Sequence, residues 1–309
     1  MSILEEIISG TTPNAIFLTV IGEKFQKDFE RISLPHLKEY CLRYGIGLLI
    51  LKEYIDKENE NVSPYSDCAG YQRLLIPEAI VNDFSQYKYI CDLDVDCIPG
   101  PMARDIFSYP EDGLLDDTIY LTYPTPFNLP RAELGRRLSL LRKTFVDKTF
   151  PLDSLLMGSD EFEKETLGFN FSGPIATMGT CMGSARLIAH CNRIVYNAIA
   201  SNFSGYLQNY KNHIFREEAK ISWLPYEFQA IWSYEIAMFY PFLFSNQGDQ
   251  ILYDSLMATL LRVDMLHFAG TWPENNIFHK GPFFKPGSMG NYYKKFPSYF
   301  VENITPKSY

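Results

Sequence analysis

The stretch "YKYICDLDVDCIPG", residues 87–100, places Asp92, Asp94 and Asp96 on alternate positions of an otherwise apolar run. Carboxylates on one face of a strand repel one another at neutral pH, and burying an unpaired ion is costly. In a parallel α/β sheet, the carboxyl ends of the strands face the crevice where ligands bind. We therefore expect Asp94 and Asp96, at the end of this strand, to converge on a hard divalent cation such as Mn²⁺ or Mg²⁺.

The elements before this run have the order that such a sheet needs. "NAIFLTVIG" (14–22) predicts a core strand, the following segment has apolar residues at helical spacing up to Gly45, and "IGLLILKEY" predicts a second strand. "YQRLLIPEAIV" predicts helix on both sides of Pro77, directly before the aspartate strand. Strands that alternate with helices indicate a mainly parallel sheet flanked by helices, so we expect an α/β fold.

Beyond Pro99 the pattern is looser. The sequence predicts a strand at "TIYLTYP", a helix at "RAELGRRLSLLRKTF", a strand that feeds a long helix from "PIATMGTCMGSARL" onward, and a helix at "PYEFQAIWSYEIAMF". The residues from 271 to 309, rich in Pro, Gly and aromatic side chains, indicate an irregular wrap. No linker divides the chain, so we expect one domain over 1–309.

Composition excludes several classes of function. The chain has 28 Lys and Arg against 37 Asp and Glu, a formal charge of −9, and no long basic stripe, which disfavours nucleic acid as a partner. The 6 cysteines form no C-x-x-C pair, as expected for reduced, buried thiols. No stretch reaches the roughly 20 apolar residues of a membrane helix, and no secretory signal is evident. We therefore expect no transmembrane segment and a cytoplasmic location.

The aspartate strand resembles a known motif. "YKYICDLDVDCIP" is similar to the D-x-D strand of nucleotide-sugar glycosyltransferases of the GT-A fold, in which the carboxylates hold a metal that bridges the donor diphosphate. This resemblance implies a GT-A type, Rossmann-like fold with Asp94 and Asp96 as metal ligands, and Asp92 as a neighbour that orients a ligand or a loop. "HFAGTWP" resembles the H-x-x-G segment of glycogenin-like, family 8 retaining enzymes, which implies His267 as third ligand and Gly270 beside it.

The resemblance also implies residues that bind the substrates. Arg73 in "YQRLLIPEAI" matches a basic residue that contacts the donor sugar and diphosphate, and Gly179 in "TMGTCMGSARL" matches the acceptor side. Thr19 and Val20 would cradle the nucleotide at the end of the first strand. One departure is that Thr271, Trp272 and Pro273 follow the H-x-x-G glycine, in place of the family's K-P-W. Either Lys280 or Lys285 would reach the diphosphate, or Arg73 and the metal would neutralise the leaving group without a lysine.

The catalytic position has two candidates. Glu227 in "PYEFQAIW" would face the anomeric centre at the start of a helix, where it would stabilise positive charge on the sugar or position the acceptor. Another alignment uses "GDQ" and therefore Asp249. In this scheme the nucleotide-binding half covers about 14–100, the acceptor-binding half about 101–275 and the C-terminal tail 276–309.

The function implied is metal-dependent transfer of a sugar from a nucleoside-diphosphate sugar, a UDP-hexose by the H-x-x-G resemblance, to a hydroxyl of a carbohydrate, protein or lipid acceptor, with retention. Two alternatives stay open. "ICDLDVDCI" also fits a haloacid-dehalogenase-like phosphohydrolase, with Asp92 as nucleophile, Asp94 as acid/base, and Asp249 and Asp254 as a later acidic pair. A sugar-nucleotide-binding domain without activity is the other. The donor sugar, its base and the acceptor are not specified by the sequence.

Overall fold

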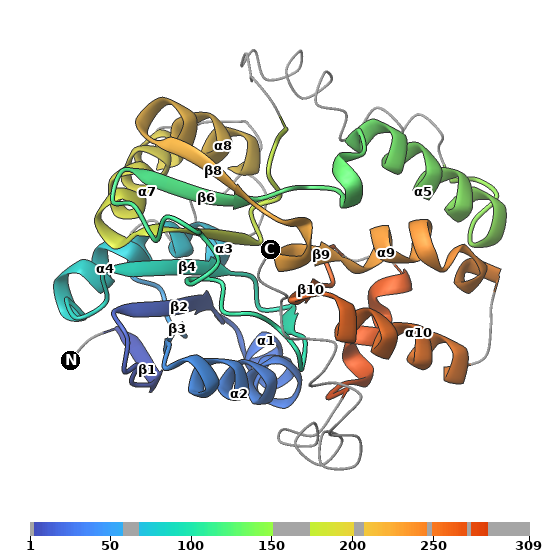
Figure 1. The fold of residues 1–309 in the computed structure, drawn as a ribbon, viewed down its shortest axis with the longest axis horizontal. Helices are drawn as coiled ribbons and strands as arrows, with labels where there is room; N and C mark the ends of the chain where they lie inside the picture. The colour runs from blue at the N-terminus through green and yellow to red at the C-terminus, as the bar shows by residue number, and fades with distance from the viewer. Residues whose placement is uncertain are drawn as a thin grey trace.

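The computed structural model describes residues 3–57, 68–150, 174–200, 207–245, 249–270 and 273–283. Its main feature is a sheet with the strand order β1-β3-β2-β4-β7-β6-β8, seen on the left of Figure 1. The strands are β1 (Leu4–Ile8), β2 (Asn14–Thr19), β3 (Gly47–Leu51), β4 (Tyr89–Leu93), β6 (Thr118–Thr122), β7 (Thr180–Ser184) and β8 (Lys220–Leu224).

The first half of the sheet is built as the sequence predicts. β2 pairs in parallel with β3 on one side and with β4 on the other. The connection from β2 to β3 runs through α1 (Glu23–Asp28), a π-helical turn η1 (Phe29–Ser33) and α2 (Leu34–Tyr44). Gly45 follows α2 with a φ of 65°, a left-handed conformation that glycine adopts without strain. The predicted β-α-β unit is therefore confirmed.

The second half makes the sheet mixed. β7 runs antiparallel to both β4 and β6, while β6 and β8 are parallel. β1 pairs antiparallel with β3 at the opposite edge. The sequence analysis did not predict β1 or β8, whose half-exposed, polar residues lack the continuous apolar character of the inner strands.

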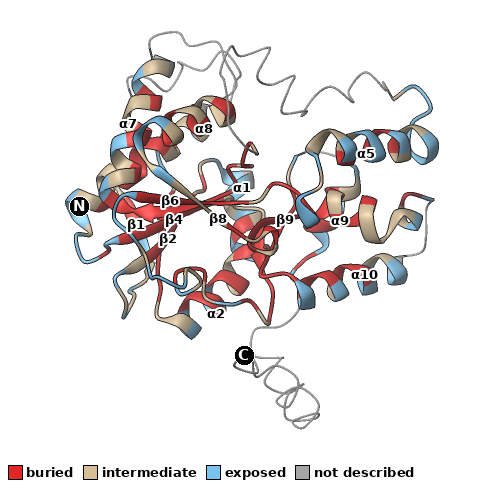
Figure 2. Cartoon of the chain, turned by 45° about the horizontal axis from the view of Figure 1, so that its top comes forward, coloured by how far each residue is buried: buried red, intermediate tan, exposed pale blue. Residues whose placement is uncertain are grey.

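Helices cover both faces of this sheet. On one face, residues of α4 (Ile76–Asp83), α7 (Ala185–Ala200) and α8 (Leu207–Glu218) pack against Phe17, Leu49 and Ile90 of the strands. On the other face, residues of η1 and α2 pack against Ile16, Leu18 and Leu48. Figure 2 shows the inner strands coloured as buried between helices that alternate between buried and exposed residues. The structure is thus an α/β fold with helices on both faces of a central sheet.

A second, smaller sheet lies between the main sheet and a group of helices. Its order is β5-β10-β9, with β5 (Cys97–Pro99) antiparallel and β9 (Ala230–Ile231) parallel to the central β10 (Met265–His267). Figure 1 shows α5 (Arg131–Phe145), α9 (Trp232–Phe239) and α10 (Asp249–Arg262) together on the right, beyond this sheet. The predicted helix over "PYEFQAIWSYEIAMF" is wrong in its first half, where a 3-10 turn, η5 (Tyr226–Gln229), and β9 precede α9. Pro225 and the extended backbone of Ile231 break the helix there.

Short helical turns complete the described chain. α3 (Cys68–Gln72) and η2 (Arg73–Leu75) lead into α4, η3 (Pro126–Asn128) precedes α5, and η6 (Pro241–Ser245) follows α9. The predicted irregular wrap begins instead with a 3-10 helix, η7 (Pro273–Lys280), and residues 284–309 lie outside the described residues. Cys41, Cys91, Cys97, Cys181 and Cys191 are free and buried, as expected for reduced thiols. In the part of the chain described, no helix combines the length and the apolar character needed to cross a membrane.

Candidate functional site

The D-x-D segment lies at a turn that follows β4. The strand ends at Leu93, and the amide of Cys97 donates to the carbonyl of Asp94 (3.1 Å), which closes a turn over residues 94–97. The amide of Asp94 donates to the carbonyl of Gly179 (2.9 Å) at the start of β7. The expectation that strand alternation alone aligns Asp94 with Asp96 is therefore wrong, because Asp96 lies in the turn and not on β4.

Pairing of the small sheet brings His267 to this turn. In the antiparallel pairing of β5 with β10, Cys97 lies opposite His267. The next bond, from the amide of Phe268 to the carbonyl of Asp96 (3.1 Å), extends this pairing into the turn. The imidazole is thereby held beside a segment 170 residues earlier in the chain, which no local sequence pattern could place.

Two of the residues predicted as metal ligands, Asp94 and Asp96, each lie close to the third, His267. Nε2 of His267 lies 3.4 Å from Oδ2 of Asp94 and 3.3 Å from Oδ1 of Asp96. The imidazole is buried, whereas the two carboxylates are 27% and 28% exposed and remain open to solvent. Burial lowers the pKa of His267, but the carboxylates of Asp96 and Asp94 outweigh it, so the pKa is raised above its usual value. The two partly exposed carboxylates outnumber the one imidazole, so the cluster can attract a cation.

Cys97 is a further donor that the sequence analysis did not consider. The ligand atoms of Asp96, Cys97 and His267 all lie within 4.8 Å of one another. Burial raises the pKa of the Cys97 thiol well above its usual value, and Asp96 adds to the effect. The thiol is protonated at neutral pH, so the two carboxylates and the imidazole are the better ligands, and this donor set suits Mn²⁺ or Mg²⁺.

Arg73 joins this cluster to a second group of charges. Its Nη1 donates to Oδ1 of Asp94 (2.5 Å), while Nε and Nη2 donate to Oδ1 of Asp92 (3.2 and 2.7 Å). Nη2 also donates to the carbonyl of Met178 (3.3 Å). Within the described chain four of the five guanidinium N–H groups are engaged, which leaves one on Nη1. Arg73 thus orients Asp94, and one N–H on Nη1 has no partner among the described residues.

Asp92 is enclosed by cations. Its Oδ1 accepts from Arg73, its Oδ2 accepts from Nζ of Lys211 on α8 (2.8 Å), and its side chain is 1% exposed. Burial raises the pKa of Asp92, but Arg73 and Lys211 outweigh it and lower the pKa below its usual value. Sequence reasoning missed Lys211 because α8 carries no motif. Asp92 is placed to hold Arg73 and does not face an open site.

This placement does not favour the phosphohydrolase alternative. A nucleophilic carboxylate needs an accessible oxygen, and both oxygens of Asp92 are engaged in a buried ion-pair network. The strand that carries it is also preceded in the chain by β2 and β3, as the sequence analysis noted. The side chain of Asp249 lies outside the part of the chain whose side chains are described.

Gly179 and Gln229 complete the surroundings of the imidazole. Nδ1 of His267 lies 3.2 Å from Nε2 of Gln229, and Oε1 of Gln229 accepts from the hydroxyl of Thr122 (2.7 Å). A Cβ atom on Gly179 would lie 2.6 Å from both Nε2 of Gln229 and Cε1 of His267. The glycine is therefore required for close approach to the imidazole, and no acceptor-side contact is needed to explain it.

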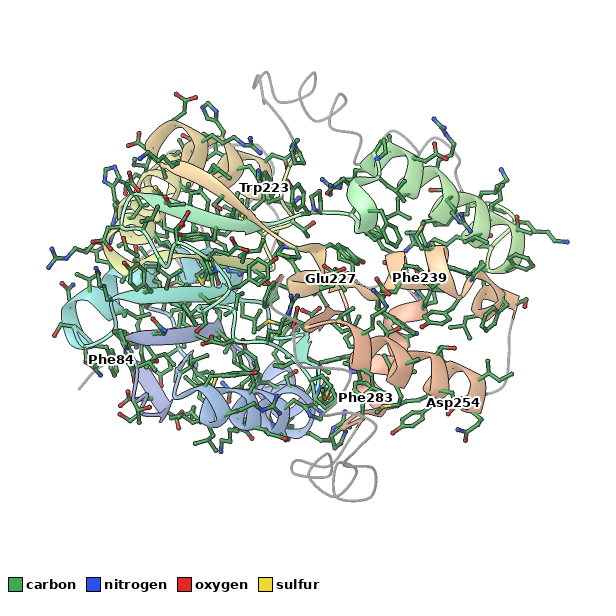
Figure 3. The ribbon with its side chains drawn as sticks, viewed as in Figure 1. Phe84, Trp223, Glu227, Phe239, Asp254 and Phe283 are labelled. Carbon is green, nitrogen blue, oxygen red and sulfur yellow. The ribbon has the colours of Figure 1, made fainter. Side chains whose placement is uncertain are left out.

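Glu227, predicted as the catalytic residue, lies in the same turn as Gln229. Figure 3 labels it in the segment between β8 and α9. Its carboxylate acts electrostatically on Arg104 and Glu235, and its carbonyl accepts from the amide of Asp264. The residue of η5 that contacts the imidazole is Gln229, which the sequence analysis missed although "YEFQ" contains it.

Of the remaining predicted residues, Thr19 and Val20 lie at the end of β2, whereas Gly270 and Lys280 follow β10. Thr19 ends β2, and its buried Oγ1 has no hydrogen-bond partner among the described residues. Val20 is fully buried, and its amide donates to the carbonyl of Leu51. Gly270 has a φ of 80°, and its carbonyl accepts from Nδ2 of Asn275 (3.2 Å). Lys280 is exposed at the end of η7, and Lys285 lies outside the described residues.

Comparisons identify the fold. No protein-family model and no curated protein sequence matches the chain. A glycosyltransferase involved in the glycosylation of the major capsid of PBCV-1 has a similar structure, with a TM-score of 0.50 and 11% identity, over 87% of this chain and 99% of that one. The bifunctional WbbM glycosyltransferase (TM-score 0.47, 13% identity, 93% of this chain and 52% of that one) also matches. The galactosyltransferase LgtC, solved with donor and acceptor sugar analogs, matches with a TM-score of 0.46 and 12% identity, over 86% of this chain and 95% of that one.

The first of these similarities covers almost the whole of both chains. Together with the strand order and the helices on both faces of the sheet, it shows that the chain has a GT-A type glycosyltransferase fold. The fold predicted from the D-x-D and H-x-x-G segments is confirmed.

Proposed function

We propose that the chain is a metal-dependent glycosyltransferase that uses a nucleoside-diphosphate sugar, a UDP-hexose, as donor. The observation that supports this most strongly is the convergence of Asp94, Asp96 and His267 from segments far apart in the sequence. Two partly exposed carboxylates and a buried imidazole fit a Mn²⁺ or Mg²⁺ ion. When bound, such an ion would neutralise charge on the donor diphosphate.

The chain's own residues have separate tasks in this proposal. Asp94 and Asp96 hold the cation, and His267 completes the ligand set. Arg73 keeps Oδ1 of Asp94 occupied, so that Oδ2 is left to face the metal position, and its remaining N–H can donate to a phosphate oxygen. The nucleotide is expected at the carboxyl end of β2, where Thr19 ends the strand.

The acceptor has a candidate location on the same sheet. A cavity of about 390 Å³ opens after β6 and is lined by Tyr123, Thr125, Asn128 and Arg131 among others. Tyr123 stacks on Trp223, labelled in Figure 3, with ring centroids 5.0 Å apart. Tyr123 gives this cavity one aromatic face beside polar side chains, a combination that is typical of small-ligand sites. We propose that the acceptor hydroxyl approaches from this side. The bond from the anomeric carbon to the phosphate oxygen breaks, a bond to the acceptor oxygen forms with retention, and the proton of the hydroxyl passes to the departing diphosphate.

A thermal-shift panel of nucleotide sugars, with and without Mn²⁺, tests the proposal. A ligand that binds only the folded protein raises its melting temperature, so a UDP-hexose should raise it more with Mn²⁺ than without. Release of UDP should then be measured with the same donor. Binding without UDP release over long incubation would support the inactive binding domain, and release of phosphate from simple phosphomonoesters would support the phosphohydrolase. No metal-dependent shift with any nucleotide sugar would contradict the proposal.

A further inference from the structure

Behind His267 lies a buried chain of polar groups that the proposed metal site does not include. The hydroxyl of Thr122 at the end of β6 donates to Oε1 of Gln229 (2.7 Å), and Nε2 of Gln229 lies 3.2 Å from Nδ1 of His267. All three residues are buried, and Gln229 is 2% exposed. The opposite ring nitrogen, Nε2 of His267, is the one that faces Asp94 and Asp96.

Coordination of a cation through Nε2 of His267 requires a hydrogen-bond acceptor at Nδ1. A neutral imidazole that binds a cation through one nitrogen carries its proton on the other, and that N–H needs an acceptor. A primary amide has both an acceptor oxygen and donor N–H groups, so Gln229 can accept from a protonated Nδ1 or donate to an unprotonated one. The hydroxyl of Thr122 can likewise donate or accept, so it satisfies the far end of the amide in either orientation.

Packing keeps the amide and the imidazole together. The backbone of Gly179 lies so close that a Cβ atom there would be 2.6 Å from Nε2 of Gln229 and 2.6 Å from Cε1 of His267. The imidazole also has a fixed backbone position, because His267 pairs with Cys97 and with Ile231 in the small sheet. The ring cannot turn away from the carboxylates while the amide holds Nδ1.

We propose that Gln229, anchored by Thr122, is a positioning residue for His267. It holds Nε2 of the imidazole toward Asp94 and Asp96 and supplies the acceptor that Nδ1–H needs when a cation binds. This inference rests on the metal-dependent function proposed above. It assigns to Gln229 a role in metal affinity that does not require contact with the substrate.

Two substitutions at residue 229 test this role against simple space filling. Gln229→Met keeps the length of the side chain but offers no acceptor, so Mn²⁺ affinity should fall by about 10- to 100-fold, as is typical for loss of a group that orients a metal ligand. Gln229→Glu offers one oxygen to Nδ1–H and one to the hydroxyl of Thr122, so its affinity should stay within a few-fold of that of the wild type. A space-filling role predicts the opposite order, because methionine is easily buried and a carboxylate is not. Affinity is measured by calorimetry in the presence of UDP.

Two further variants separate affinity from folding. Thr122→Val leaves Gln229 in place but removes its anchor, and it should weaken Mn²⁺ binding by a smaller factor than Gln229→Met. Tyr40→Phe loses a buried hydroxyl that donates to the carbonyl of Arg104 and accepts from the amide of Ile106, so it should lower the melting temperature without changing Mn²⁺ affinity. If Gln229→Met fails to fold, the Mn²⁺ affinities of Thr122→Val and Tyr40→Phe test the role instead. Weaker binding in Thr122→Val alone supports it, and equal affinity in the two variants overturns it.

The outcomes distinguish the inference from the function on which it rests. If the wild type binds no Mn²⁺, or binds it equally well after Asp96→Asn, the metal-dependent function itself is wrong. If the wild type binds Mn²⁺ through Asp96, but Gln229→Met and Thr122→Val bind it as tightly, only the positioning role is overturned.

Discussion

Two clusters of charged side chains lie side by side at the carboxyl end of β4, and their composition is opposite. In the first, which we call the Asp92 cluster, one carboxylate lies between Arg73 and Lys211. In the second, the His267 cluster, the carboxylates of Asp94 and Asp96 face one imidazole. The first cluster has an excess of positive charge and is closed, whereas the second has an excess of negative charge and is partly exposed.

The difference follows from the position of each aspartate relative to the end of the strand. Asp92 belongs to β4, where strand neighbours and α8 enclose its side chain. Asp94 and Asp96 lie in the turn beyond it, where neighbouring strands no longer cover them. Arg73 connects the two clusters, because it binds Asp92 and one oxygen of Asp94. The comparison indicates that Asp92 has a structural role, while Asp94 and Asp96 are accessible for the cation binding proposed above.

The largest effect is expected from Asp96→Asn in the His267 cluster. Loss of this carboxylate should reduce metal-dependent turnover of a UDP-hexose by on the order of 10³-fold, since a bound metal contributes several kcal/mol and each 1.36 kcal/mol is tenfold in rate. The free energy of unfolding of the metal-free protein should change far less than turnover, because loss of this partly exposed carboxylate removes its attraction to His267 but also its repulsion with Asp94. Donor turnover and urea denaturation measure the two quantities. Unchanged turnover would show that the His267 cluster does not hold the metal, and would contradict the separate roles given to the two clusters.

In the Asp92 cluster the expected loss is of stability. Asp92→Asn leaves two buried or half-buried cations without their shared carboxylate, and removal of one partner of a buried pair typically costs about 3–5 kcal/mol. The midpoint of urea unfolding measures this. Asp117→Asn is the matched control, since its ion pair with Lys220 is exposed, and its midpoint should stay close to that of the wild type. Equal midpoints for the two variants would show that the Asp92 cluster is not structural.

A smaller effect is expected from Gly179→Ala, at the wall of the His267 cluster. The added methyl group must displace Gln229 or His267, and such overpacking typically costs about 1–3 kcal/mol. Mn²⁺ affinity should fall together with stability. Gly135→Ala in α5 is the control, because no atom lies within 4 Å of its added Cβ, and helix propensity should stabilise it by up to about 1 kcal/mol. A Gly179→Ala protein that binds Mn²⁺ normally would contradict the packing described here.

The smallest effect is a difference in pH dependence between the clusters in protein kept free of metal by a chelator. The raised pKa of His267, caused by Asp96 and Asp94 against the effect of burial, gives stability that is present below its usual value of 6.5 and lost as the pH rises through the folded pKa. The lowered pKa of Asp92, caused by Arg73 and Lys211 against burial, gives stability that is present above 3.8 and lost as the pH falls through the folded pKa. Urea midpoints across pH measure both.

His267→Asn should abolish the loss of stability above pH 6.5 and leave the loss of stability at acid pH unchanged. Asp92→Asn should abolish the loss at acid pH and leave the loss above pH 6.5 unchanged. A His267→Asn protein with an unchanged alkaline limb would show that the imidazole is not paired with the carboxylates.

Local sequence determined the elements that carry the site. Continuous apolar runs predicted β2 and β3, helical spacing predicted the segment before Gly45 and the bounds of α5, and the D-x-D segment was placed at the end of a strand. These features could be read because the period of burial along a strand or helix is set by the backbone over a few residues. The H-x-x-G segment pointed to His267, although only by resemblance.

The tertiary structure decided which side chains surround the site. Lys211 reaches Asp92 from α8, and Gln229 lies beside Nδ1 of His267. Asp96 faces the imidazole through a turn and a strand pairing, not through alternation along β4. Such contacts join residues tens to hundreds of positions apart, and their free energies depend on how whole strands and helices pack. No periodicity in the chain encodes them, so only the folded molecule shows them.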